Sequence, residues 1–225
     1  DVNRSDIKGF TFNFGANYQR PISEKLNLHV STTYAPEMDL DSENFRTIST
    51  IDFASGTGRT IDQRELDLSE TQFTFPSKYS LGAGIGQTNK WFVGAEYSNV
   101  GSSSYQDSFS FRNDGGEYED ASQFSLGGFY VPDYNSFTSY LERVVYRAGF
   151  RYDETGLIVN GESINEFGMS FGLGLPIGQL FSNANFGIEL GQRGTRDAGL
   201  VQEKFLRLSV GLSLNDKWFT KRKFD

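Results

Sequence analysis

The feature that most constrains the fold of this chain is a strict alternation of apolar residues with small or polar ones. Between Leu206 and Leu214 every second residue is Leu or Val, and the residues between them are Arg, Ser and Gly. The stretch Phe167–Leu175 repeats the pattern, with Phe, Met and Leu set against Gly and Ser. Successive side chains of a β-strand point to opposite faces, so a period of two predicts strands with one apolar face.

Seven further stretches alternate in the same way, and together they predict nine antiparallel strands. The nine are Ile7–Tyr18, Leu26–Tyr34, Tyr79–Ile85, Trp91–Tyr97, Phe124–Tyr130, Val144–Tyr152, Phe167–Leu175, Ala184–Leu190 and Leu206–Leu214. Short turns between them alternate with long polar connections, which are Ala35–Ser77, Gly101–Ala121, Glu154–Asn165 and Gln192–Glu203. This regularity is typical of an up-and-down barrel with short turns at one rim and long loops at the other.

The second face of these strands indicates what surrounds the sheet. A soluble sandwich carries Lys, Glu and Thr on its outer face, whereas here that face is mostly Gly and Ser. Aromatic residues such as Tyr18, Tyr34, Trp91 and Trp218 gather at strand ends, as in the interfacial girdles of membrane barrels. We therefore expect an all-β, antiparallel, transmembrane β-barrel in contact with the lipid of a Gram-negative outer membrane. A soluble β-sandwich or lipocalin-like barrel is the alternative.

The strand count predicts a partial barrel within a single domain, residues 1–225. If the last strand ends at the periplasmic side, the first one starts at the cell surface, which requires earlier strands. Nine is also an odd number, whereas bacterial single-chain barrels have even counts. We therefore expect the C-terminal part of a larger barrel, with the upstream part as its partner. Residues 36–76 would form a long extracellular loop with a hairpin of Phe45–Phe53 and Glu65–Phe75, and residues 215–225 a periplasmic tail.

Composition excludes several function classes. The net charge of −8 argues against a nucleic-acid partner, and no cysteine is present for thiolate chemistry or cysteine-based zinc sites. The one histidine, His29, shares a strand face with Asn27 and Ser31, which lie too nearly in a row to form a nucleophile and its base. Asp39, Asp41 and Glu43 resemble a calcium loop without its glycine, because the sixth position is Asn44. We expect no enzyme activity, no metal site and no cofactor.

Several strand sequences resemble a known family of outer-membrane barrels. These are Phe75–Gly86, Trp91–Tyr97, Val144–Tyr152, Phe167–Pro176 and Leu212–Phe219, which look like the Bacteroidetes members of the long-chain fatty acid transporter (FadL-like) family. The resemblance implies a 14-stranded barrel plugged by an N-terminal hatch, of which this chain would supply the last nine strands. It further implies uptake of hydrophobic small molecules, such as long-chain fatty acids, across the outer membrane.

The same resemblance suggests ligand-contacting residues. The connection Pro36–Phe75 falls where the family has a groove among its extracellular loops, so its apolar residues become candidates for binding a hydrophobic ligand. They are Met38, Leu40, Phe45, Ile48, Leu66, Leu68 and Phe73. Alternatively, these residues pack the hairpin within the loop. The alternative function is a non-transporting barrel that serves as a subunit or scaffold of an outer-membrane protein export or assembly complex, with other outer-membrane proteins as partners.

Overall fold

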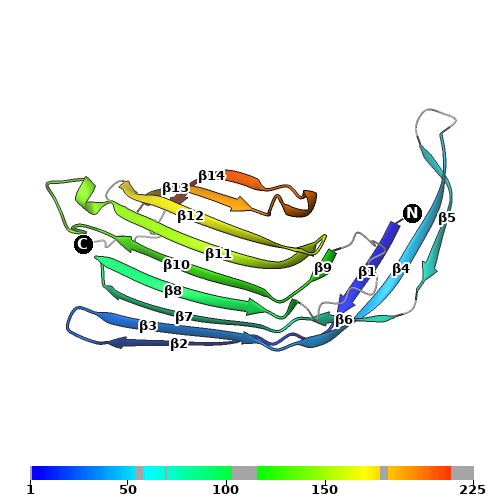
Figure 1. The fold of residues 1–225 in the computed structure, drawn as a ribbon, viewed down its shortest axis with the longest axis horizontal. Coiled ribbons are helices and arrows are strands. Elements are labelled where there is room, and N and C mark those ends of the chain that lie inside the picture. Colours follow the sequence, from blue (N-terminus) through cyan, green and yellow to red (C-terminus); the bar gives the residue numbers. More distant parts are fainter. Residues whose placement is uncertain (1, 54–57, 69, 103–115, 178–181, 214–225) are drawn as a thin grey trace, which may run out of the picture.

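The computed structural model describes residues 2–53, 58–68, 70–102, 116–177 and 182–213, and antiparallel strands dominate it (Figure 1). The main sheet is an up-and-down meander. Its strands, in sheet order, are β2 (Phe14–Pro21), β3 (Asn27–Ala35), β7 (Lys78–Gln87), β8 (Trp91–Val100), β10 (Ala121–Tyr130), β11 (Val145–Val159), β12 (Glu162–Ile177), β13 (Ser182–Arg193) and β14 (Glu203–Ser213). A short strand, β9 (Gly116–Tyr118), pairs with β11. The all-β antiparallel prediction is confirmed.

In the described connections, Leu141–Arg143 forms a short 3₁₀ helix, η2, and Asp197–Gly199 forms another, η3. Among the described residues, no helix is long and apolar enough to cross a membrane.

The register gives the main sheet two contrasting faces, because paired residues of adjacent strands share a face. One row of partners across the sheet holds four consecutive glycines, and we call its face the inner face. That row is Gln19, His29, Gly84, Gly94, Gly127, Gly149, Ser170, Glu189 and Arg207. A row of the opposite, outer face is apolar throughout: Tyr18, Val30, Ala83, Ala95, Leu126, Phe150, Met169, Leu190 and Leu206.

The main sheet is open. β2 lies at one end of the strand order and β14 at the other, and these two strands are not paired to each other in the part of the chain that the structure describes. The expectation that this chain does not close by itself is therefore confirmed. The bulky outer face is exposed, with 70% of Val210 and of Leu212 accessible. So large an apolar surface marks an interaction with a membrane or another protein.

The predicted first strand, Ile7–Tyr18, is wrong in its extent. The structure ends β1 (Val2–Lys8) before Gly9 and starts β2 at Phe14, so the intervening residues belong to neither strand. A Cβ atom on Gly9 would lie 2.4 Å from Leu40 Cδ2, so glycine permits the chain to pass this close to its neighbour. Phe10 and Phe12 lie within the break and alternate in step with Phe14 of β2, which is why periodicity did not reveal it.

The predicted long connection Glu154–Asn165 is instead a continuation of two strands. β11 and β12 extend until Asn160 and Gly161 alone join them. Both turn residues have positive φ, 53° and 80°, as a type I′ hairpin turn requires. An Asn-Gly pair between alternating strands is a strong hairpin signal, and the sequence analysis overlooked it.

A second, smaller sheet extends from the long-connection rim, and we call it the projecting sheet (Figure 1). It contains β1, β4 (Met38–Asp52), β5 (Arg59–Asp67) and β6 (Thr71–Phe75), with β4 paired to each of the others. The β3–β7 pair continues directly into the β4–β6 pair, from Ala35 opposite Lys78 to Met38 opposite Phe75. Pro36 and Pro76 fall within this junction on the two strands. Proline lacks the N–H that a ladder needs, so the junction marks where one sheet gives way to the other.

Candidate functional site

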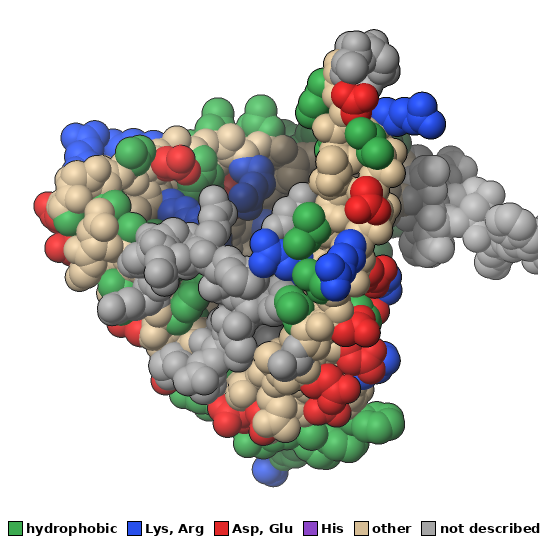
Figure 2. Space-filling view, turned by 90° about the vertical axis from the view of Figure 1, so that its right-hand side faces the viewer, with side chains coloured by type: hydrophobic (Ala, Val, Ile, Leu, Met, Phe, Trp, Pro, Cys, Tyr) green, Lys and Arg blue, Asp and Glu red, His purple; other side chains and the backbone are tan. Residues whose placement is uncertain are grey.

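The projecting sheet has one apolar and one charged face. In β4, Met38, Leu40 and Ile48 alternate with a second set that contains Asp39, Asp41 and Glu43. The apolar face remains partly uncovered, because Ile7 is 49% exposed, Ile48 44% and Phe75 42%. Figure 2 shows acidic side chains along one border of this sheet, which stands out beside the hollow of the main sheet. A sheet with one apolar face in water calls for a covering partner.

The predicted ligand residues do not form one site. Met38, Leu40 and Ile48 share a face of β4, and Leu66 joins that face because it is paired with Arg46. Leu68 is half-buried beside them, with its backbone N–H bonded to the Asn44 carbonyl at 2.9 Å. The backbone of Phe73 pairs with Leu40.

Phe45 lies on the opposite face, where the Arg4 guanidinium is 6.0 Å from its ring centroid. No pocket on one face of the sheet could therefore include all seven residues, although six of the seven positions fall on the same face.

A buried polar cluster crosses the apolar face and ties three strands together. Asn44 of β4 is 2% exposed and accepts a hydrogen bond from Ser5 Oγ of β1 at 2.8 Å. Its Nδ2 donates to Thr71 Oγ1 of β6 at 2.8 Å, and Ser42 Oγ donates to its Oδ1 at 3.1 Å. Shifting a strand by one residue would break these bonds, so the cluster fixes the register of the projecting sheet. Sequence analysis considered Asn44 only as a misfit in a calcium loop.

Replacing Asn44 by Leu should destabilise the projecting sheet by about 1–3 kcal/mol, because Ser5, Ser42 and Thr71 would lose a buried partner. Native-state hydrogen exchange of the amides in β4 and β6 would measure the loss. Ser49→Leu, on the opposite face of the same strand, is the control and should change protection little. Equal protection in wild type and Asn44→Leu would contradict a register-fixing role.

The charged face is held by surface ion pairs. Arg4 Nη2 lies 2.8 Å from Asp6 Oδ2, and Lys8 Nζ lies 2.7 Å from Glu43 Oε1. The hydrogen bond to Glu43 raises the pKa of Lys8 above its ordinary value, so this ammonium stays charged throughout the neutral range. Asp39 accepts a bond from Thr74 Oγ1 at 2.8 Å. Asp39 and Glu43, two of the three carboxylates that resemble a calcium loop in the sequence, thus have partners in the sheet. Within the described residues, no group of three or more His, Cys, Asp or Glu could hold a metal ion.

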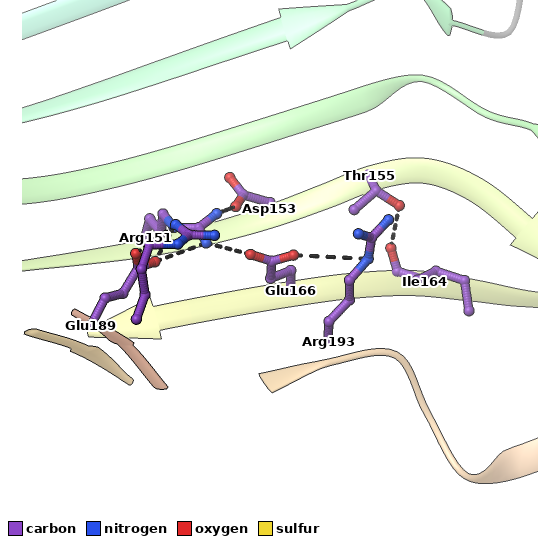
Figure 3. A network of polar contacts seen from close by, with 8 residues as sticks. Arg151, Asp153, Thr155, Ile164, Glu166, Glu189 and Arg193 are labelled. Atoms are coloured by element: carbon purple, nitrogen blue, oxygen red, sulfur yellow. Dashed lines mark hydrogen bonds and ion pairs between the residues drawn. The ribbon is translucent and has the colours of Figure 1, made fainter. Parts of the chain in front are cut away.

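The inner face of the main sheet carries a second polar constellation, centred on Arg151 of β11 (Figure 3). Its guanidinium forms ion pairs with Asp153, with Glu166 of β12 and with Glu189 of β13, the last at 2.9 Å. Two more exposed arginines extend the network. Arg207 lies 2.8 Å from Glu189, and Arg193 lies 3.8 Å from Glu166. The three carboxylates are 15–17% exposed, so the network is well shielded from solvent.

This network borders a hollow of about 500 Å³ on the inner face. The glycines Gly84, Gly94 and Gly149 line it, together with Glu96 and Arg151. His29 also lines the hollow, and its ring meets Phe92 edge-on with centroids 5.6 Å apart. The sequence had identified this face as small and polar with scattered charges. Periodicity does not give the pairing of those charges across strands, because the pairing depends on register.

Comparison with known proteins identifies the family. The family model for BamG matches residues 1–225, which is the whole chain. This chain belongs to the BamG family. The protein is located in the Gram-negative outer membrane, as the sequence had predicted. No curated protein matches it.

One solved structure that aligns with the chain is described as the CymD monoaromatic hydrocarbon channel. It shares 16% sequence identity, with a TM-score of 0.43, over 80% of this chain and 46% of the channel. The chain thus spans less than half of the channel's length. A similarity this weak supports no conclusion about activity.

The BamG match corrects two predictions. The resemblance to the long-chain fatty acid transporters was wrong as a family assignment, because the match to BamG covers every residue. Uptake of hydrophobic molecules as the main function is overturned with it. The strand motifs that suggested the transporter family reflect the alternation of apolar with small residues, and this pattern of strands is not specific to one family.

Proposed function

We propose that this BamG-family protein is a non-enzymatic structural subunit of the outer-membrane protein assembly (BAM) complex. Its main sheet lies in the membrane as part of a β-barrel wall, and its projecting sheet binds other outer-membrane proteins of the complex. The observation that carries this proposal is the projecting sheet, whose apolar face extends from the rim and is partly exposed in the described part of the chain. The family assignment supports it independently.

The outer face supports the membrane part of the proposal. Bulky apolar side chains follow every strand of that face, whereas charged pairs such as Arg151–Glu189 lie on the inner face. In the described part of the chain, β2 and β14 each have one unpaired edge, which could not remain exposed in lipid, since unsatisfied backbone groups are costly there. We therefore propose that further strands, in an upstream part of the same barrel, complete the wall. We also propose that the short-turn rim faces the periplasm, so that residues 36–76 are extracellular and 215–225 periplasmic.

The shape of the projecting sheet favours a protein partner over a small ligand. Its apolar residues are spread over several strands of one face, and buried polar side chains occupy the middle of that face. Small ligands bind in concave sites that enclose most of their surface. Protein interfaces, in contrast, are extended and combine apolar with polar contacts, and Arg64, the partner of Ile48, supplies a charge on this same face.

Ile48→Glu should release the protein from the assembly complex. Ile48 is an exposed apolar residue of this face, and replacing it by a carboxylate removes an apolar anchor that is worth about 2 kcal/mol or more, or roughly 30-fold in affinity. The measurement is co-purification of outer-membrane assembly proteins with the tagged full-length chain from native membranes. Ser49→Glu is the matched control, because it adds the same charge to the next residue on the opposite face. Undiminished co-purification of Ile48→Glu would contradict a contact through this face.

A further inference from the structure

The connection between β10 and β11, residues 131–144, is an ordered loop at the short-turn rim. Val131 and Val144 are 3% and 1% exposed and close its base. Asp133 N–H donates to the Glu142 carbonyl at 2.9 Å, and the nearly buried Ser136 Oγ accepts from Ser139 N–H at 3.2 Å. The loop therefore has its own hydrogen bonds and small core.

This ordered loop directs its large apolar side chains outward. Phe137 is fully exposed at 102%, and Leu141 is 67% exposed. Tyr134 and Tyr140 are about half-exposed. The Arg143 guanidinium lies over the Tyr140 ring, 5.5 Å from its centroid. A loop that buries valine and serine while it exposes phenylalanine and leucine presents an interaction surface.

The loop lies against the lipid-facing side of the sheet. Tyr146 belongs to the outer face, because it is paired with Leu173. Its hydroxyl donates a hydrogen bond to the Leu141 carbonyl of the loop at 3.2 Å. Trp91, Tyr130 and Tyr146 are consecutive partners along one row of that face. Tyr140 donates to the Pro176 carbonyl at 3.1 Å, which holds the loop over the end of β12. The exposed side chains of the loop thus continue an aromatic row at the end of the strands.

We infer that residues 131–144 form a membrane-surface anchor that inserts into the lipid headgroup region at this rim. Phe137 and Leu141 enter the boundary of the acyl chains, the tyrosines lie at headgroup level, and Arg143 binds lipid phosphate. This inference rests on the proposed function in one respect, since it requires that the main sheet spans the membrane.

Lipid fits this surface better than a protein partner does, for two reasons. The loop is continuous with the Trp91–Tyr130–Tyr146 row, and amphipathic rings in such a row prefer the interface between lipid and water. An arginine stacked on a tyrosine next to them keeps its charge at the level of the phosphates while its stem covers apolar surface.

Single-cysteine labelling tests the inference, because the chain contains no cysteine of its own. The full-length protein carrying Phe137→Cys would be labelled with an environment-sensitive fluorophore in native outer-membrane vesicles that contain the assembly complex. Quenching by aqueous iodide is compared with quenching by lipids that carry a nitroxide at the headgroup. Two matched positions serve as references: Val201→Cys, 77% exposed at the opposite rim, and Val210→Cys, on the outer face.

The label at residue 137 should emit at shorter wavelength than the label at 201, with weaker iodide quenching and strong quenching by headgroup nitroxide. A label at 137 that iodide quenches as it does at 201 would overturn the anchor. So would a label shielded from both quenchers, which would mean that protein covers the loop. If iodide quenches the label at residue 210, the main sheet is not embedded in the membrane, and the proposed function is refuted as well. If lipid protects the label at 210 while iodide quenches the label at 137, only the anchor is refuted.

Discussion

Val210→Arg is expected to destabilise the membrane-inserted protein by about 2–4 kcal/mol, the cost of placing an arginine on the lipid face near mid-bilayer. Val210 lies on the outer face of β14, opposite Phe186, and 70% of it is accessible. Lipid would cover this surface in the membrane, so the arginine would have to leave water for hydrocarbon. Equilibrium unfolding of the protein in lipid vesicles, followed by tryptophan fluorescence, measures the change.

Ser209→Arg provides the control for this experiment, because Ser209 is the next residue and faces inward. Ser209 is paired with Gly187, where no side chain opposes it. The inner face already holds arginines, so the cost there should be much smaller than at Val210. Equal costs at the two positions would refute the assignment of the outer face to lipid.

Most of the strand framework could be predicted from the sequence, because the alternation of side chains between two faces is a property of each strand separately. The strand Leu206–Leu214 needs no knowledge of its neighbours to be recognised. The failures arose where a second interaction overrides periodicity. β1 ends before Gly9, which lies close to Leu40, a residue far along the chain. Asn160-Gly161 was a local signal that went unused.

The candidate site was less predictable than the strands, and the reason is again register. Alternation within β4 could separate Phe45 from Ile48, but it could not show that Ser5 and Thr71 would meet at Asn44. The apolar residues of the loop were grouped as ligand contacts because of a family resemblance, and the register places Phe45 on the other face of the sheet from Ile48. Fold and function are separable in this way because many families share one barrel wall.

Arg151→Leu should destabilise the main sheet by about 2–4 kcal/mol, somewhat less than the cost of breaking a fully buried ion pair. The guanidinium is 28% exposed and holds three carboxylates from three strands together. Without it, Asp153 and Glu166 keep their shielded positions and repel each other, while leucine cannot donate hydrogen bonds. Asp153 is affected most, because its Oδ1 is buried without a hydrogen-bond partner among the described residues.

The same unfolding measurement in lipid vesicles tests this prediction, with Arg207→Leu as the control. Arg207 is 65% exposed and makes one ion pair, with Glu189, so its loss should cost about 1 kcal/mol or less. Adding Glu166→Gln to Arg151→Leu should recover part of the lost stability, because one of the uncompensated charges disappears. A double variant whose cost equals the sum of the two single costs would show that these residues are not coupled. In that case the three inner-face carboxylates would owe their positions to the strand register alone, and Arg151 would be one surface cation among several.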